Sequence, residues 1–235
     1  MKQGISATRV TVSTFGIIVG LAGIEHGIGE VLQGNVTPEG VTIESWPESE
    51  LLGILAGEPA MTIVPNLLLT GILAILASLI FLVWVTMFVQ RKHGGLVLIL
   101  LSVVMLLVGG GFGPPLLGIM LGTAATRINA PLNWWRAHLT AGSQRFLARL
   151  WPWSLVAGLI AWLSLLPGTI LLDHFFGVDN PDLVVPVLTF SAFGLLLLTI
   201  FAGFAYDVRQ RTDLQQACRG AVDTNEMAAR ERGSS

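Results

Sequence analysis

Charged residues and cysteine are both scarce in this chain. Of its 235 residues, 12% are Asp, Glu, Lys or Arg and 53% are hydrophobic, whereas a soluble domain usually carries about 25% charged residues. A water-soluble globule of this size cannot hide so much apolar surface, so the composition predicts an integral membrane protein whose main partner is the lipid bilayer. The single cysteine, Cys218, excludes an intramolecular disulfide and a cysteine-based metal cluster. The 13 basic residues are too dispersed for a nucleic-acid-binding surface.

Long apolar runs are what the chain does contain. Runs of about 20 residues, enough to cross about 30 Å of hydrocarbon, predict full transmembrane helices near residues 10–32, 61–89, 151–172 and 183–206. A fifth apolar stretch, 96–125, is interrupted by glycines and prolines that disfavour a continuous helix. We therefore expect two short helices, 96–108 and 116–125, joined by a tip. The tip consists of Gly109, Gly110, Gly111, Phe112, Gly113, Pro114 and Pro115.

The distribution of Lys and Arg predicts the orientation of these segments, because cytoplasmic loops are enriched in both residues. Segments 34–60 and 173–182 hold no Lys or Arg, so we expect them outside the cell. Arg91 and Lys92 precede the stretch 96–125, and four arginines follow it between residues 127 and 149. Both ends of that stretch should then be cytoplasmic, which requires a helical hairpin, either re-entrant or made of two short spans. Both termini of this multi-pass cell-membrane protein should also be cytoplasmic.

Three further segments complete the predicted architecture, an all-α polytopic membrane bundle. In residues 132–150, apolar side chains lie on one face of a helix and basic side chains on another. This pattern predicts an amphipathic helix in the inner interface. The outer loop 34–60 carries five glutamates, and we expect a short strand at 41–45 within it. We expect residues 1–206 to form a single transmembrane domain. The polar segment 207–235 should be a partly disordered cytoplasmic tail.

Two pairs of spans resemble each other in sequence. The first and fourth spans each end with an acid and a histidine, followed by a glycine and another acid. The spans after them open with Ile63-Val64-Pro65 and Val184-Val185-Pro186. This pattern is typical of a parallel internal repeat about an axis along the membrane normal. Apolar helices also resemble one another by composition alone, so both interpretations remain open.

Polar residues near the outer ends of the spans are the candidate functional site. Ionisable groups at membrane depth are energetically unfavourable and usually face protein or water. His26 and Glu30 lie four positions apart, on one face of a helix. We expect a polar vestibule formed by Glu25, His26, Glu30, Asn66, Asp173 and His174.

Several kinds of chemistry fit such a vestibule. The sequence requires no cofactor, but a divalent metal held by His26, Glu30 and His174 is one interpretation. A proton or ion pathway is another, and mutual pairing of interfacial residues is a third. Haem ligation would use His26 and His174 outside with His93 and His138 inside, although these last two are expected to be solvated loop histidines.

Glycines are expected to have two roles. The tip 109–115 either lines a substrate path or is a structural turn, since non-helical backbone at membrane depth must be buried in protein or line a cavity. Small residues spaced along the first span predict a face for close helix packing, within the bundle or across a dimer interface. They are Gly16, Gly20, Gly23 and Gly27.

Three functions are compatible with these features. The one we expect first is permeation of a small solute, an ion or a proton through the outward-facing vestibule. The alternatives are a metal-dependent membrane enzyme that uses the acid–histidine cluster and a non-catalytic membrane subunit. A homo-oligomer or a complex with other membrane subunits fits each of them.

Overall fold

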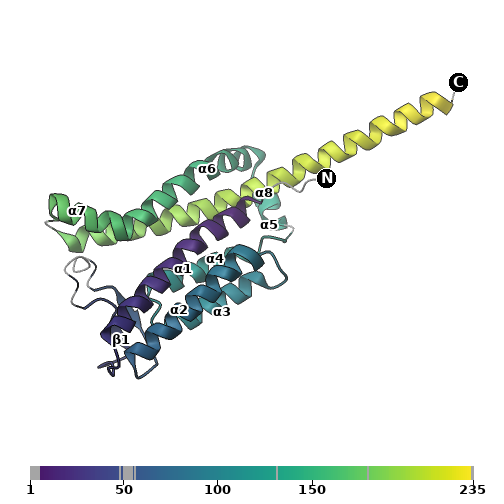
Figure 1. The fold of residues 1–235 in the computed structure, drawn as a ribbon. Coiled ribbons are helices and arrows are strands. Elements are labelled where there is room, and N and C mark those ends of the chain that lie inside the picture. Colours follow the sequence, from purple (N-terminus) through teal and green to yellow (C-terminus); the bar gives the residue numbers. More distant parts are fainter. Residues whose placement is uncertain are drawn as a thin grey trace.

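The chain folds into an all-α bundle with four long apolar helices and two shorter ones (Figure 1). The computed structural model describes residues 6–47, 49, 55, 57–130, 132–178 and 180–233. The segments able to cross a bilayer are Ala7–Gln33, Leu67–Phe88, Ala141–Leu163 and Leu183–Gln216. The predicted fold class is therefore confirmed, and the protein is a multi-pass membrane protein.

The first half of the chain forms four packed helices. Helix α1 (Ala7–Gln33) lies against α2 (Leu67–Val83), which continues as a π-helical turn at Trp84–Phe88. The short helices α3 (Gly94–Leu107) and α4 (Gly113–Ala125) pack on each other, and α4 also contacts α1. Asn129 donates a hydrogen bond of 2.8 Å to the Gln90 carbonyl. The two ends of the α3–α4 segment therefore lie together, as a hairpin requires.

The hairpin helices begin and end slightly differently from expectation. Helix α4 starts at Gly113, so Pro114 and Pro115 lie in its first turn and not in the tip. Proline is compatible with that position because the first N–H groups of a helix have no partner within the helix. With 14 and 13 residues, α3 and α4 are each about 20 Å long, less than the about 30 Å of a hydrocarbon core.

The second span also begins later than its apolar sequence indicated. Residues Pro59–Met61 form strand β2, which pairs antiparallel with β1 (Thr42–Glu44), the strand expected at 41–45. Helix α2 begins at Leu67, where the Asn66 side chain accepts a hydrogen bond from the Leu69 backbone N–H. The prediction of helix from residue 61 was wrong because Pro65 and the cap at Asn66 set the start of the helix.

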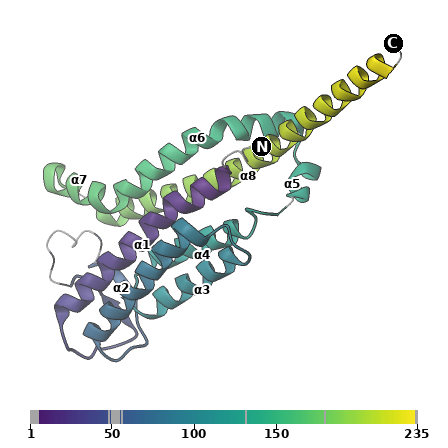
Figure 2. The same cartoon turned by 45° about the vertical axis from the view of Figure 1, so that its right-hand side comes forward.

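The second half of the chain is a helix pair, α6 and α8. Helix α6 (Ala141–Leu163) continues through a π-helical turn at Ser164–Gly168 into α7 (Thr169–Phe176), and it packs along α8 (Pro181–Gly233). Figures 1 and 2 show this pair as one layer and α1–α4 as another, with the two layers diverging toward α7 and β1. Helix α8 continues to Gly233, so the polar segment after residue 206 extends the last span without a break.

The expected interfacial helix is divided between two elements. Residues Asn133–His138 form the short helix α5, and residues from Ala141 onward belong to α6. Thr140 separates the two helices because its side chain caps α6 by accepting a hydrogen bond from the Ser143 N–H. The boundary predicted between residues 150 and 151 therefore lies ten positions earlier, and Pro152 falls within a continuous helix.

The two layers are joined at the end that holds the N-terminus of α1, here called the closed end. Asp207 of α8 accepts hydrogen bonds from the Ser6 hydroxyl at 2.7 Å and from the Ala7 N–H at 2.7 Å. Trp151 of α6 donates to the Thr11 hydroxyl at 3.0 Å. The carboxylate of Asp207 thus satisfies N–H groups of the first turn of α1, where negative charge is favourable.

The glycine stripe of α1 faces α2 in this structure. A Cβ atom at Gly16 would lie 2.4 Å from Val85, and one at Gly20 would lie 2.3 Å from Leu82. The same holds for Gly23 and Gly27, where a Cβ atom would come within 2.3 Å of Ser78 and 2.8 Å of the Gly71 carbonyl. Close approach of α1 and α2 therefore depends on the absence of side chains at these positions.

Candidate functional site

The candidate site is a cavity of about 510 Å³ between the two layers, near the end that carries the hairpin tip, here called the open end. Helices α1 and α4 form one wall, and α6, the π-helical turn and α8 form the other. The walls are mainly apolar and include the aromatic rings of Phe112, Trp162 and Phe193. Three ionisable residues also line the cavity: Glu25, His26 and Glu58.

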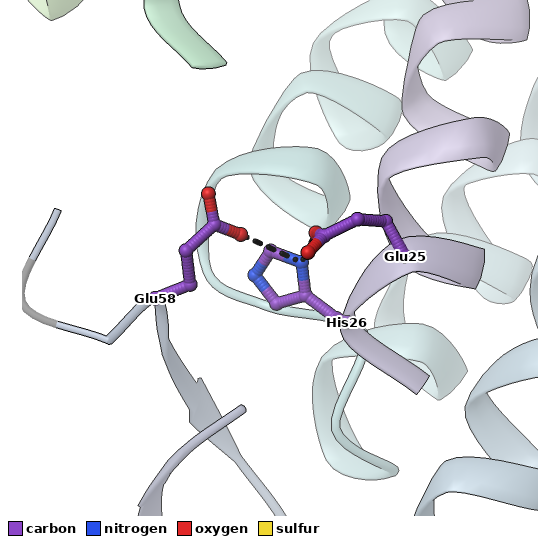
Figure 3. A group of neighbouring side chains, drawn as sticks. All are labelled: Glu25, His26 and Glu58. Atoms are coloured by element: carbon purple, nitrogen blue, oxygen red, sulfur yellow. Dashed lines mark hydrogen bonds and ion pairs between the residues drawn. The ribbon is translucent and has the colours of Figure 1, made fainter. Parts of the chain in front are cut away.

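These three residues form a compact cluster around one ring nitrogen (Figure 3). The Nδ1 atom of His26 lies 2.9 Å from Glu25 Oε2 and 3.2 Å from Glu58 Oε2. The same atom lies 3.1 Å from the Ala22 carbonyl oxygen. The side chains of His26 and Glu58 are 8% and 11% exposed, and that of Glu25 is 26% exposed. Two carboxylates therefore meet an imidazole in a largely buried position.

Glu58 was not predicted as a site residue. It lies in the outer loop directly before β2, with a left-handed backbone (φ 54°), as does Gly57 before it (φ 66°). Its carbonyl accepts a hydrogen bond of 3.1 Å from the Ser45 N–H, which ties this turn to the end of β1. Because a side-chain-bearing residue is disfavoured in this conformation by about 1–2 kcal/mol, the fold imposes the turn that directs the carboxylate toward His26.

The environment of Glu58 raises the pKa of its carboxyl group. Burial raises the pKa of the Glu58 carboxyl to about 7, with the adjacent Glu25 acting in the same direction and His26 in the opposite one. An ordinary glutamate is ionised well below neutral pH. Glu58 therefore exchanges its proton near neutral pH, at the mouth of an apolar cavity.

Glu30 lies one turn beyond His26 and is fully buried. Its Oε1 atom accepts a hydrogen bond of 3.4 Å from Ser45, whereas Oε2 has no partner among the residues that the structure describes. A Cβ atom at Gly109 would lie 2.3 Å from both carboxylate oxygens, and one at Gly111 would lie 2.3 Å from His26 Nε2. The hairpin tip therefore packs its backbone directly onto the two polar side chains of α1.

The other residues of the expected vestibule lie elsewhere. Asn66 caps α2 and donates a hydrogen bond to Asn35. Asp173 and His174 are exposed on α7, where Asp173 accepts a hydrogen bond from the Val178 N–H. None of them lines the cavity. The structure therefore brings together Glu25 and His26, adds Glu58, and leaves Asn66, Asp173 and His174 outside the cluster.

The metal ligands expected from sequence do not converge in the structure either. Among the described residues, one group places three metal-ligating side chains within 4.8 Å of one another, and it consists of Glu25, His26 and Glu58. Glu30 and His174 are not part of it. The histidines considered for haem also differ in burial. His26 is buried, whereas His93 and His138 are exposed.

The chain matches no protein-family model, and no curated protein or solved structure is significantly similar to it. Its class therefore follows from the fold itself. It is a multi-pass, multi-helix membrane protein, and the surfaces of α2 and α8 expose many large apolar side chains suited to lipid contact.

Proposed function

We propose that this protein is a transporter of small amphipathic solutes and that the present conformation is open toward the outer side of the membrane. The observation that carries the proposal is the cavity between two layers that are separated at one end and joined at the other. Its volume of about 510 Å³ lies within the range typical of small-molecule sites. The absence of Lys and Arg in segments 34–60 and 173–182 supports an outer orientation of the open end.

The lining of the cavity defines the class of solute. Aromatic and aliphatic side chains from both layers favour an apolar body. The Glu25–His26–Glu58 cluster offers hydrogen-bonding and charged groups at one position on the wall, which favours a single polar end. A molecule with both parts would be oriented by the cluster and held by the apolar walls.

The interface between the layers is tightly packed on the far side of the cavity. Phe15 of α1 and Thr199 of α8 are both fully buried there. A Cβ atom at Gly158 of α6 would lie 3.0 Å from the ring of Phe15. A solute in the cavity therefore meets an apolar barrier, and passage requires the layers to separate at the closed end. Such rocking of one helix group against another is a common basis of alternating access.

Cysteine accessibility tests the proposal with two matched positions on one helix. In a Cys218→Ser background, Thr189→Cys places a thiol on the cavity wall, and Thr199→Cys places one at the packed interface. We expect a membrane-impermeant thiol reagent added outside intact cells to label Thr189→Cys and to leave Thr199→Cys unlabelled. Equal labelling of both positions, or labelling of neither, would rule out an outward-open cavity.

A metal-dependent membrane enzyme is the second candidate, because one cluster in the described chain has the ligand types for an ion. An enzyme with a fixed site does not need its layers to move. It would keep Thr199→Cys protected under every condition, whereas a transporter exposes this position when the closed end opens.

A further inference from the structure

Three oxygen atoms converge on one ring nitrogen in the Glu25–His26–Glu58 cluster. Two carboxylate oxygens and the Ala22 carbonyl oxygen lie within 3.2 Å of Nδ1 of His26. An imidazole nitrogen carries at most one proton, so His26 Nδ1 can serve only one of these three oxygens at a time, and a proton on Glu58 is shared with Glu25. Protonation of the ring leaves that number unchanged, because the second proton lies on Nε2.

We infer that Glu25, His26 and Glu58 bind one divalent transition-metal ion at the polar end of the cavity. An ion placed among the three side chains displaces the protons of the cluster and becomes the partner of both carboxylates. Two glutamates with a neutral imidazole balance the charge of a divalent cation. Buried carboxylates are favourable when they coordinate a metal and unfavourable when they are left unpaired.

The spacing of the atoms fits coordination to one ion. Zinc lies about 2.0–2.2 Å from imidazole nitrogen and carboxylate oxygen, so adjacent ligands of a tetrahedral site are about 3.2–3.6 Å apart. The Nδ1 atom of His26 is 2.9 Å from one carboxylate oxygen and 3.2 Å from the other. The three ligand atoms all lie within 4.8 Å of one another. Small rotations of the glutamate side chains complete the geometry.

The surroundings hold the three ligands in place. Glu25 and His26 are fixed on the long helix α1. Gly111 of the hairpin tip lies against Nε2 on the other side of the ring. Glu58 is directed inward by its left-handed backbone. Three side chains from one helix and one loop therefore reach the same point without rearrangement of the fold.

The donor set also indicates which ions are favoured. One imidazole nitrogen and two carboxylate oxygens suit Zn²⁺, Mn²⁺ or Fe²⁺. Ca²⁺ is less suitable because it takes six to eight oxygen ligands. All three residues line the cavity, so the remaining coordination position faces it. There the ion would meet the polar end of a solute, a step that rests on the proposed function.

Zinc binding by the purified full-length protein tests the site. The protein is isolated in detergent through a tag without histidine, treated with a chelator and titrated calorimetrically with Zn²⁺. We expect one ion per chain and at least about 10-fold weaker binding in His26→Ala and in Glu58→Gln. The matched exposed residues His174→Ala and Glu39→Gln should bind as the wild type does. Wild-type affinity in the cluster variants, or the absence of stoichiometric zinc, would overturn the site.

X-ray absorption of zinc-loaded wild-type protein provides a readout that needs no variant to fold. One imidazole and two carboxylates in the zinc shell are expected, whereas two or more imidazoles would contradict the assignment. The outcome is separable from the transport proposal. Thiol labelling of Thr189→Cys and Thr199→Cys without zinc tests the cavity, and zinc titration tests the cluster.

Discussion

At the scale of single residues, the glycines of the hairpin tip allow backbone to lie on buried polar side chains. Gly109 and Gly111 have left-handed backbones, with φ of 92° and 78°. Any Cβ atom at either position would overlap Glu30 or His26. The tip is thus a turn that also covers the polar residues beside the cavity, and its role in a substrate path stays a prediction.

Replacement of Gly109 by alanine should destabilise the protein. The added Cβ atom would lie 2.3 Å from the Glu30 carboxylate on a backbone that disfavours side chains, and such strain costs about 1–3 kcal/mol. Thermal denaturation in detergent measures the effect. Gly113→Ala is the control because no atom of the described residues lies within 4 Å of its Cβ position. Equal melting temperatures for the two variants would contradict this account of the tip.

The raised pKa of Glu58 predicts a pH dependence of stability in chelator-treated protein. Folded Glu58 keeps its proton until about pH 7, whereas an unfolded chain releases it near pH 4.3. Its contribution to stability is complete below the unfolded pKa and is lost as pH rises through the folded pKa. The loss amounts to up to about 3 kcal/mol.

Melting temperatures between pH 5 and pH 8 measure this contribution. We expect the decrease with rising pH to be smaller in Glu58→Gln than in wild type. Glu39→Gln, which changes an exposed glutamate of the same loop, should leave the wild-type slope intact. A Glu58→Gln variant with an unchanged slope would mean that Glu58 does not retain its proton in the folded state.

The sequence predicted the site in part, for a physical reason. Glu25, His26 and Glu30 stood out because ionisable residues within an apolar span are unfavourable without a partner. Glu58 is one of five glutamates in a loop, where charge is unremarkable. Only the left-handed turn and the β1–β2 pairing bring Glu58 close to His26. The spacing of apolar residues in the sequence predicts neither of them. Asp173 and His174 repeat the acid–histidine order of Glu25 and His26, but they are exposed on α7.

At the scale of elements, contact between α1 and α2 depends on the glycine stripe. Gly20→Leu should destabilise the protein by about 1–3 kcal/mol, because a Cβ atom there would lie 2.3 Å from Leu82. Gly194→Leu in α8 is the matched control, since its Cβ position is open and leucine has the higher helix propensity. Thermal denaturation and gel filtration compare the two. If Gly20→Leu melts like wild type and keeps the same oligomeric size, close α1–α2 packing is refuted.

Helix existence was predictable, whereas several helix ends were not. Apolar length identified all four spans, and cation placement identified the hairpin. The ends depended on single residues such as Thr140, whose side chain caps α6. Asp207 was assigned to a polar tail, yet it is 3% exposed and caps α1 from the far end of the chain. Amino-acid composition does not predict hydrogen bonds between residues so far apart in the sequence.

At the scale of the whole molecule, α1–α2 and α6–α8 are two antiparallel helix pairs, and the cavity lies between α1 and α4 on one side and α6 and α8 on the other. Consecutive spans form such pairs in any membrane protein, so common ancestry of the two halves stays a prediction. The acid–histidine corners of the two pairs differ, since His26 is buried and His174 is exposed. In the proposed transport mechanism, the interface between the two layers opens at one end and then at the other.

The closed end should control that separation. Asp207 joins α8 to the start of α1 through hydrogen bonds of 2.7 Å to Ser6 and to Ala7. Arg211, one turn further along α8, donates to the carbonyls of Ala130 and Ile128 at 2.6 and 2.8 Å. Removal of the Asp207 carboxylate takes away the acceptor of the Ala7 and Thr8 N–H groups and weakens the junction of the two layers at this end.

Labelling of Thr199→Cys in inside-out vesicles, with and without Asp207→Ala, tests this account most directly. Asp213→Ala, which removes an exposed carboxylate of the same helix, is the control. We predict that a membrane-impermeant thiol reagent labels Thr199→Cys from the cytoplasmic side only when Asp207 is replaced. A Thr199→Cys thiol that stays protected in Asp207→Ala would contradict alternating access between the two layers. Equal reaction in all three backgrounds would contradict control of the closed end by Asp207.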